Sequence, residues 1–141
     1  MNHPNVIKVI NHFNHEDNSL IVFELLTGGD LFTKIKHKEL KYNQIAPIFR
    51  GICTGIQYIH SRKIIHRNLK SETILLDTHM NPKIVDFGLA AKLSPRRTFC
   101  GCYYYMAPEI LKNQEYNEKA DIWALGIILY EMVYGDVPFK G

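Results

Sequence analysis

Five isoleucines recur at steps of three and four residues between positions 45 and 59, and no other feature of the sequence constrains the fold as strongly. They are Ile45, Ile48, Ile52, Ile56 and Ile59. Residues at these steps share one face of an α-helix, so the pattern predicts a helix whose apolar stripe must be buried. Asn43 is the expected N-terminal cap, Pro47 fits the first turn, and the helix should end near Ser61.

Shorter patterns on both sides of this helix predict strands and two further helices. Strands are expected at Val6–Phe13 and Ser19–Glu24, and short apolar runs follow the helix at Ile64–Ile65, Ile74–Leu76 and Lys83–Val85. A short helix is expected over Asp30–Lys38, directly after a pair of glycines. A last helix over Glu118–Tyr134 has Asn117 as its cap and Gly135 as its stop. Residues 86–106 show no periodicity, and a long irregular segment in a compact domain is usually functional.

The composition is that of one globular domain. The chain has 141 residues, of which 46% are hydrophobic and 22% charged, so it can bury one core but not two ordinary ones. Its net charge is only +3 and its basic residues are scattered, which argues against a nucleic-acid partner. The most hydrophobic run, Ile122–Tyr134, is too short to span a bilayer and contains Glu131, so no membrane association is expected.

The cysteines indicate neither a disulfide framework nor a zinc site. Their number is three, which is odd and low and is typical of a reducing compartment. Cys100 and Cys102 have no second pair of Cys or His residues at zinc-finger spacing. Because the N-terminus also lacks an apolar signal core, we expect a soluble intracellular protein of the cytoplasm.

Three short stretches contain the residue types of a catalytic site. They are His66-Arg67-Asn68-Leu69-Lys70-Ser71-Glu72-Thr73, Asp86-Phe87-Gly88 and Ala107-Pro108-Glu109. In this order and at these separations, they resemble the catalytic loop, the magnesium loop and the activation segment of the protein kinase family. Lys70 resembles the serine/threonine type, and the residues from Leu129 to Phe139 are similar to the calcium/calmodulin- and AMP-activated kinase group.

The resemblance covers essentially the whole chain and implies a protein-kinase-like α+β fold. Residues 1–26 would be a two-strand remnant of the small lobe with the hinge, and residues 27–141 the upper part of a mostly α-helical large lobe. We expect a partial kinase domain, because the glycine-rich loop and the strand lysine of the family do not appear and Met1 resembles an internal methionine read as a start. A two-stranded remnant should expose an apolar face.

The resemblance implies serine/threonine protein phosphorylation with ATP and Mg²⁺ as cofactors. Glu24 and Leu26 would offer backbone groups to the adenine, and Leu75 would form the apolar floor beneath it. Asp30 would lie near the ribose or near a basic residue of a protein substrate. Asp86 would supply the principal magnesium carboxylate.

Three residues depart from the family pattern in the catalytic constellation. Asn68 occupies the position of the catalytic carboxylate, and an amide has no basic site near neutral pH that could take the proton of the substrate hydroxyl. Thr73 occupies the position of a metal-binding amide, and its hydroxyl can bind Mg²⁺ only with a different geometry and reach. Cys102 stands where the family has Thr or Ser, and a thiol is a weaker hydrogen-bonding group.

Other residues match the family pattern. Arg67 would receive a phosphate group of the activation segment, and Thr98 stands where the family has its phosphothreonine. Asp121 would be a buried carboxylate that holds the backbone of the catalytic loop. Three functions stay open: a kinase of impaired activity acting on protein substrates, a non-catalytic pseudokinase module that binds or scaffolds a partner protein, and a truncated remnant without function.

Overall fold

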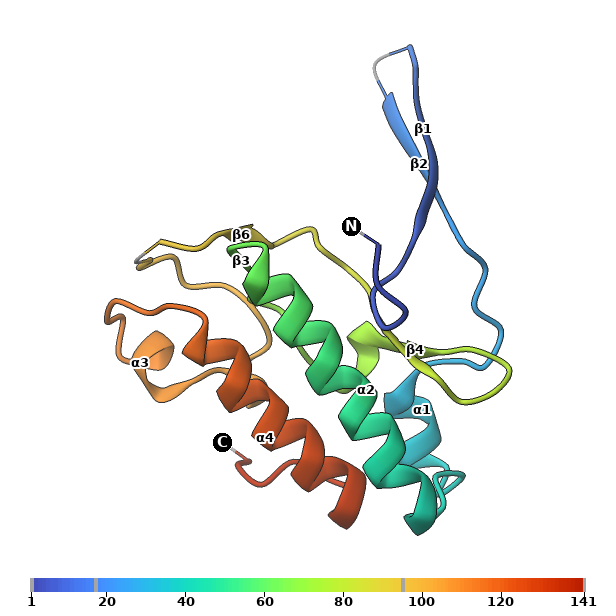
Figure 1. The fold of residues 1–141 in the computed structure, drawn as a ribbon. Helices are drawn as coiled ribbons and strands as arrows, with labels where there is room; N and C mark the ends of the chain where they lie inside the picture. Colours follow the sequence, from blue (N-terminus) through green and yellow to red (C-terminus); the bar gives the residue numbers. More distant parts are fainter. Residues whose placement is uncertain (1, 17, 95, 141) are drawn as a thin grey trace.

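A β-hairpin projects from a body made mostly of helices (Figure 1). The computed structural model describes residues 2–16, 18–94 and 96–140. Met1, and the expectation attached to it, therefore lie outside the described residues. The α+β fold expected from the sequence is confirmed.

The hairpin consists of β1 (Val9–His15) and β2 (Asn18–Phe23), which pair antiparallel. The expected start of the first strand at Val6 is wrong, because Val6 forms a parallel bridge with Ile84 in the body instead. The ladder also continues through polar residues almost to the tip. Both faces of the hairpin are exposed there, so backbone pairing proceeds without the apolar side chains on which the prediction relied.

The body is centred on two helices that lie side by side, α2 (Tyr42–Ser61) and α4 (Lys119–Tyr134) (Figure 1). The isoleucine stripe of α2 is confirmed as core, since all five side chains are at most 9% exposed. They pack with apolar residues of α4 such as Ile128, which is fully buried. Burial of each such side chain contributes about 1.5–3 kcal/mol, so this contact stabilises the body more than any local propensity.

The start of α2 differs from the prediction. Lys41 is the N-terminal cap residue, and its N–H donates to the Gln44 side-chain oxygen at 2.9 Å. Asn43 therefore lies inside the helix, and the expectation that it caps the helix is wrong. Because the helix begins at Tyr42, Pro47 falls in the second turn rather than the first.

The last long helix follows the prediction closely. α4 begins at Lys119, whose N–H donates to the Asn117 side chain at 3.0 Å. It ends at Gly135, which has a φ of 80° in the left-handed region that favours glycine. Glu118 is the N-terminal cap residue and makes no side-chain cap bond, so the expectation that Asn117 caps the helix is wrong, whereas the stop at Gly135 is confirmed.

Short elements surround the two long helices. They are α1 (Leu31–Lys36), β3 (Ile64–Ile65), η1 (Ser71–Thr73), β4 (Ile74–Leu76), β5 (Pro82–Ile84), β6 (Ala91–Lys92), η2 (Tyr103–Tyr105) and α3 (Pro108–Leu111). β3 pairs with β6 and β4 pairs with β5, both antiparallel. The segment over 86–106 is thus not wholly irregular, because it contains β6 and η2. The sequence did not predict β6, η2 or α3, because elements of two to four residues are too short to show periodicity.

The hairpin exposes apolar side chains, as expected. Seven large apolar residues of its two strands are 40–57% exposed: Val9, Ile10, Phe13, Leu20, Ile21, Val22 and Phe23. The expectation that the two N-terminal strands expose an apolar face is therefore confirmed. In the body, among the residues that the structure describes, no helix is both long and apolar enough to cross a bilayer.

Candidate functional site

The carboxylate of Asp121, in the first turn of α4, holds the catalytic loop from behind. It accepts hydrogen bonds from the backbone N–H groups of His66 at 2.9 Å and Arg67 at 3.0 Å, and the His60 Nε2 atom lies 2.8 Å from it. Asp121 is only 1% exposed, so these donors replace the water that a buried charge loses. The structural role expected for Asp121 is confirmed, and the one carboxylate joins α2, the loop and α4.

The imidazole of His66 fixes the loop over residues 66–73 to the segment over residues 85–88. It is fully buried, and its Nε2 atom lies 2.9 Å from the Val85 carbonyl oxygen. Its ring packs edge-on against Phe87 at a centroid distance of 5.1 Å. Burial lowers the pKa of His66, so the ring is neutral near pH 7 and donates from Nε2. The segment Asp86-Phe87-Gly88 is therefore held beside the catalytic loop.

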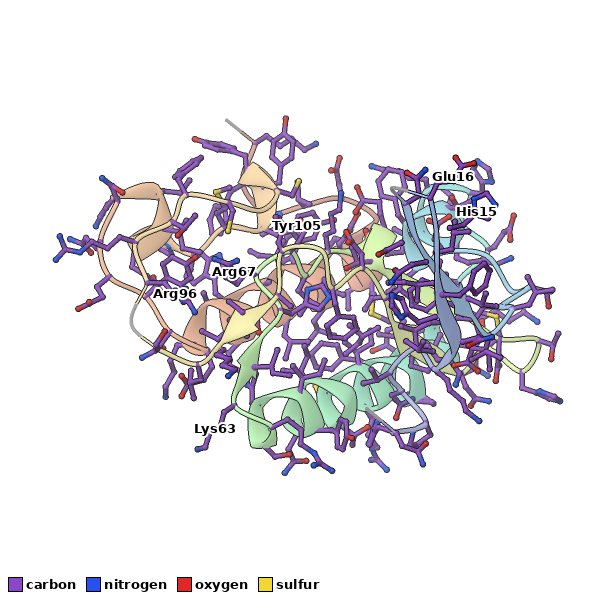
Figure 2. The ribbon with its side chains drawn as sticks, turned by 90° about the horizontal axis from the view of Figure 1, so that it is seen from above. His15, Glu16, Lys63, Arg67, Arg96 and Tyr105 are labelled. Atoms are coloured by element: carbon purple, nitrogen blue, oxygen red, sulfur yellow. The ribbon has the colours of Figure 1, made fainter. Side chains whose placement is uncertain are left out.

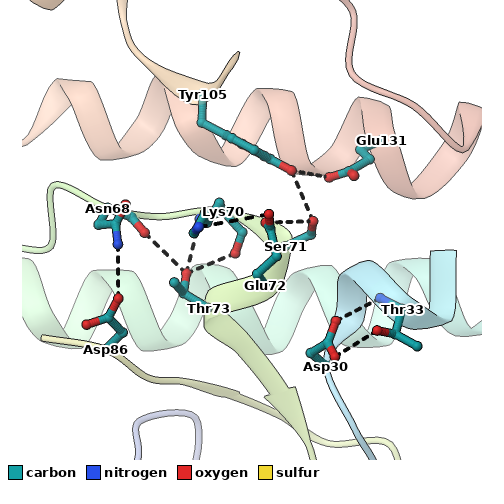
Figure 3. Close-up of polar contacts among 10 residues, drawn as sticks. All are labelled: Asp30, Thr33, Asn68, Lys70, Ser71, Glu72, Thr73, Asp86, Tyr105 and Glu131. Atoms are coloured by element: carbon teal, nitrogen blue, oxygen red, sulfur yellow. Dashed lines mark hydrogen bonds and ion pairs between the residues drawn. The ribbon is translucent and has the colours of Figure 1, made fainter. Parts of the chain in front are cut away.

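Asn68 points directly at Asp86 (Figure 3). Its side-chain Nδ2 donates to the Asp86 Oδ2 atom at 3.0 Å, and the Gly88 backbone N–H donates to Asp86 Oδ1 at 3.3 Å. Asp86 has a φ of 62°, a left-handed conformation that costs a residue other than glycine about 1–3 kcal/mol. Such backbone strain points to a functional role for this carboxylate, and in the structure both of its oxygens accept N–H donors.

Thr73 turns its hydroxyl into the backbone of the loop. The Oγ1 atom accepts a hydrogen bond from the Lys70 N–H at 3.1 Å and lies 2.9 Å from the Lys70 carbonyl and 3.3 Å from the Asn68 carbonyl (Figure 3). Thr73 is 3% exposed. The ammonium group of Lys70 lies 3.9 Å from the Glu72 carboxylate. The structure therefore places Thr73 as a brace of the loop, with its hydroxyl already used.

The cysteines of the activation segment are free thiols. Cys102 lines a small cavity of about 20 Å³ together with Asn68 and Tyr105. Cys100 lies 3.7 Å from the Tyr116 hydroxyl. Across residues 2–16, 18–94 and 96–140, no group of three or more His, Cys, Asp or Glu side chains is arranged to hold a metal ion.

A pocket of about 500 Å³ opens between the hairpin and the body. Its walls include Ile7, Val9, Ile21, Phe23, Glu24, Leu75, Val85, Asp86, Phe87 and Gly88. The volume lies in the range of small-molecule sites, and the lining is mostly apolar but includes the carboxylates of Glu24 and Asp86. Of the residues expected to bind a nucleotide, Glu24, Leu75 and Asp86 are brought together here.

The side chain of Glu24 braces the base of the hairpin. Its Oε1 atom accepts hydrogen bonds from Lys83 Nζ at 2.9 Å and from the Lys8 backbone N–H at 2.8 Å. Burial alone would raise the pKa of Glu24, but these bonds outweigh it and hold the pKa below its usual value. Glu24 is therefore ionised at neutral pH and ties β2 to β5.

Two residues expected near the nucleotide lie outside the lining of this pocket. Leu26 is partly buried in the irregular link between β2 and α1. Asp30 caps α1, because its two carboxylate oxygens accept the Thr33 N–H at 2.7 Å and the Thr33 hydroxyl at 2.8 Å (Figure 3). Contact of Leu26 and Asp30 with a ligand stays a prediction.

The activation segment is anchored through Tyr116, a residue that sequence reasoning missed. The Tyr116 hydroxyl donates to the Thr98 carbonyl at 2.9 Å, and its backbone exchanges two hydrogen bonds with Arg96 at 3.1 and 2.9 Å. Burial raises the pKa of Tyr116, and the neighbouring Arg67 partly offsets this effect. Arg67 itself donates to the Leu89 carbonyl at 2.6 Å. Figure 2 shows Arg67 and Arg96 toward the same end of the molecule, and Thr98 is exposed.

A second buried network joins η1, η2 and α4 (Figure 3). The Tyr105 hydroxyl donates to a Glu131 carboxylate oxygen at 2.6 Å and lies 3.0 Å from the Ser71 hydroxyl. Burial raises the pKa values of both Glu131 and Tyr105. The sequence contained only a weak signal for this network: a glutamate within the most apolar run of the chain.

Comparison with known proteins identifies a family. A family model described as "protein kinase domain" matches residues 1–141. Serine/threonine-protein kinase CLA4 of Candida albicans is 41% identical over 144 residues, an overlap of 97% of this chain and 15% of that protein. Serine/threonine-protein kinase shk2 of Schizosaccharomyces pombe is 42% identical over 142 residues, an overlap of 97% of this chain and 24% of that protein.

The matches cover only a small part of each relative. The chain spans 15–24% of the length of these two curated relatives. Their names specify serine/threonine-protein kinases and do not bear on the narrower calcium/calmodulin- and AMP-activated group, which stays a prediction.

Proposed function

The chain belongs to the protein kinase family, as a partial serine/threonine kinase domain, and on that premise we propose that its phosphoryl-transfer activity is impaired. The observation that carries the proposal is the Asn68–Asp86 contact. The group that faces the magnesium carboxylate is an amide, which donates a hydrogen bond at 3.0 Å and cannot accept the proton of a substrate hydroxyl.

The pocket of about 500 Å³ supports nucleotide binding as part of this proposal. Leu75 offers an apolar floor, and Glu24 lies beside the hinge through which the family contacts adenine. Asp86 would hold Mg²⁺, which neutralises the charge of the phosphates when it is bound. The donor set fits a single magnesium ion, because a carboxylate with open positions for phosphate oxygens and water is a typical site.

Replacement of Asn68 by aspartate tests the proposal. A positioned general base accelerates a reaction about 10²–10⁴-fold, so Asn68→Asp should raise the turnover rate by up to this factor. The measurement is transfer of labelled phosphate from ATP to a generic serine/threonine protein substrate. Asn113→Asp, the same chemical change at an exposed loop position, is the matched control and should leave turnover unchanged. Equal turnover by the unmodified chain and Asn68→Asp would overturn the proposal.

Nucleotide binding is tested separately by thermal melting. A ligand that binds only the folded state stabilises it and so raises the melting temperature. At a ligand concentration of a hundred times the Kd, the free energy of unfolding increases by about 2.7 kcal/mol. We expect ATP with Mg²⁺ to raise the melting temperature of the chain. Absence of a shift at millimolar ATP would contradict nucleotide binding and leave only a non-catalytic role.

We further propose that Thr98 is a phosphorylation site read by Arg67. Thr98 is exposed, its carbonyl accepts the Tyr116 hydroxyl, and Tyr116 in turn lies beside Arg67. A phosphate group on Thr98 would gain charge-assisted hydrogen bonds from arginine and order the segment. Mass spectrometry after incubation with an active kinase should find phosphate at Thr98, and Arg67→Lys should remove its ordering effect.

A binding or scaffold module is the second candidate. It is favoured by an aromatic groove of about 300 Å³, whose walls include Tyr103, Tyr104, Trp123 and Phe139. All four side chains are 36–58% exposed, and aromatic residues are enriched at protein interfaces. In either role we propose a protein as the partner and the cytoplasm as the location. Phosphotransfer by the chain that rises with Asn68→Asp would favour the first candidate.

A further inference from the structure

We propose that Asn68 is a metal ligand: its side-chain oxygen and the Asp86 carboxylate together form a site for the Mg²⁺ ion of a bound nucleotide. The inference deepens the proposed function and rests on it, because the ion is the one that the family uses. It assigns a role to Asn68, which is otherwise only a residue that lacks the basic group of the catalytic carboxylate.

The distance between the two side chains supports the site. Asn68 Nδ2 lies 3.0 Å from Asp86 Oδ2. A half-turn of the amide about its last side-chain bond exchanges Nδ2 and Oδ1, so the amide oxygen takes this position. Mg²⁺ binds oxygens at about 2.1 Å in octahedral geometry, which puts two neighbouring ligand oxygens about 3.0 Å apart. The observed separation is therefore that of two ligands on one octahedral edge.

The surroundings leave room for the other ligands. Asp86 lines the pocket of about 500 Å³, so the positions on the Asp86 side of an ion face open space for water and phosphate oxygens, whereas Asn68 lines the small cavity of about 20 Å³. Mg²⁺ usually keeps several waters and takes one or two protein oxygens, so a pair of side chains is sufficient. The strained φ of 62° at Asp86 is a second observation that this carboxylate is held for a ligand.

The alternative ligand within the loop is already occupied. The Thr73 hydroxyl is 3% exposed and bonds to the backbone at Lys70 and Asn68. A metal ion at Thr73 would have to break these contacts. At Asn68 it needs only a rotation of an amide that is partly exposed. The amide ligand that the family carries at position 73 is thus replaced by an amide five residues earlier.

Binding of Mn²⁺, a paramagnetic substitute for Mg²⁺, tests the site without any turnover. Free Mn²⁺ is measured by electron paramagnetic resonance as the 141-residue chain is titrated. Asn68→Leu keeps the side-chain size and removes the oxygen, and we expect it to weaken Mn²⁺ binding at least about tenfold. Asn68→Asp keeps an oxygen at the same place and should bind at least as tightly as the unmodified chain.

Glu72→Gln is the matched control, because it removes a carboxylate from the same loop. Glu72 accepts a long bond from Ser71 at 3.4 Å and makes a 3.9 Å ion pair with Lys70. Mn²⁺ affinity should not change in this variant. Equal loss in Asn68→Leu and Glu72→Gln would reveal nonspecific attraction and overturn the proposal. Thermal melting of each variant establishes that it is folded.

The side-chain amide signal of Asn68 gives a second readout. Addition of Mg²⁺ should shift this signal in a nitrogen–proton NMR spectrum, because the bond from Nδ2 to Asp86 is lost. Unchanged Mn²⁺ affinity in Asn68→Leu, or an unshifted amide signal at saturating Mg²⁺, would overturn the site. If Asn68→Asp still raises phosphotransfer in that case, the proposed function stands and only the metal role of Asn68 fails.

Discussion

The Tyr105 hydroxyl donates a 2.6 Å hydrogen bond to the Glu131 carboxylate, and both residues are buried. This bond connects η2, in the activation segment, to the fourth turn of α4. Burial disfavours the charged carboxylate, so the pKa of Glu131 is raised even though Tyr105 donates to it. The stability of the body must therefore depend on whether the buried Glu131 carboxyl group is protonated.

Glu131→Gln should remove one pH dependence of the free energy of unfolding. In the unmodified chain, Glu131 makes the protein less stable as pH rises, whereas ordinary acid denaturation makes a protein less stable as pH falls. A carboxyl whose folded pKa is raised contributes stability that is complete below its ordinary pKa of 4.5 and is lost as pH rises through the raised value. The unmodified chain should therefore lose stability relative to Glu131→Gln as pH rises above 4.5. Urea midpoints of both proteins across this range give the difference, and parallel profiles would contradict the raised pKa.

Glu24→Gln should show the reverse trend. The hydrogen bonds from Lys83 and Lys8 lower the pKa of Glu24, so its contribution is present above the ordinary pKa of 4.5 and is lost as pH falls through the lowered value. The unmodified chain should thus lose its advantage over Glu24→Gln in acid. The same urea series measures this, with Lys83→Met expected to shrink the pH effect. Persistence of the full effect in Lys83→Met would rule out the ion pair as its source.

Asp121→Asn should destabilise the chain by at least about 2 kcal/mol, because hydrogen bonds to a charged acceptor each contribute about 1.5–3 kcal/mol. The amide keeps one acceptor but turns a donor toward the backbone N–H groups of the catalytic loop. Glu115→Gln, at an exposed loop residue, is the control and should change stability little. Equal free energies of unfolding for the two variants would contradict the anchoring role of Asp121.

Two glycines in helices should respond to alanine with opposite signs. A methyl group at Gly55 in α2 would lie 2.7 Å from Ile84 Cδ1 and 2.8 Å from the Asn5 carbonyl oxygen, so Gly55→Ala should destabilise by about 1–3 kcal/mol. At Gly126 in α4 nothing lies within 4 Å, so Gly126→Ala should stabilise by about 0.5–1 kcal/mol through helix propensity alone. Thermal melting of the pair decides this, and a shift of the same sign in both would be the contrary result.

The long helices could be predicted because their periodicity is visible in the chain itself. The stripe from Ile45 to Ile59 and the stop at Gly135 are local signals, and both are confirmed. β6 has no such signal, because Ala91 and Lys92 form a strand only where Ile65 and Ile64 lie opposite them. The missed cap of α2 has a similar reason: Gln44 competes for the backbone, and its side chain reaches back to Lys41.

The site was less accessible to prediction than the fold. Asp121 followed from the family resemblance, but the Asn68–Asp86 contact joins residues 18 apart whose side-chain directions no local pattern fixes. The buried member of the tyrosine run was also invisible. Tyr103 and Tyr104 are 57% and 49% exposed, whereas Tyr105 is 6% exposed. Tyr105 is the buried member because it packs against α4, and this packing depends on the complete fold.

The anchoring of the catalytic loop by Asp121 separates two properties of the chain. Its buried bonds reach α2, the loop and α4, and none of them involves the hairpin. The hairpin can therefore open locally while the loop keeps its shape, so amide protons of β1 and β2 should exchange with solvent long before those of His66 and Arg67. The hairpin can thus stop enclosing a ligand while the catalytic loop stays ordered.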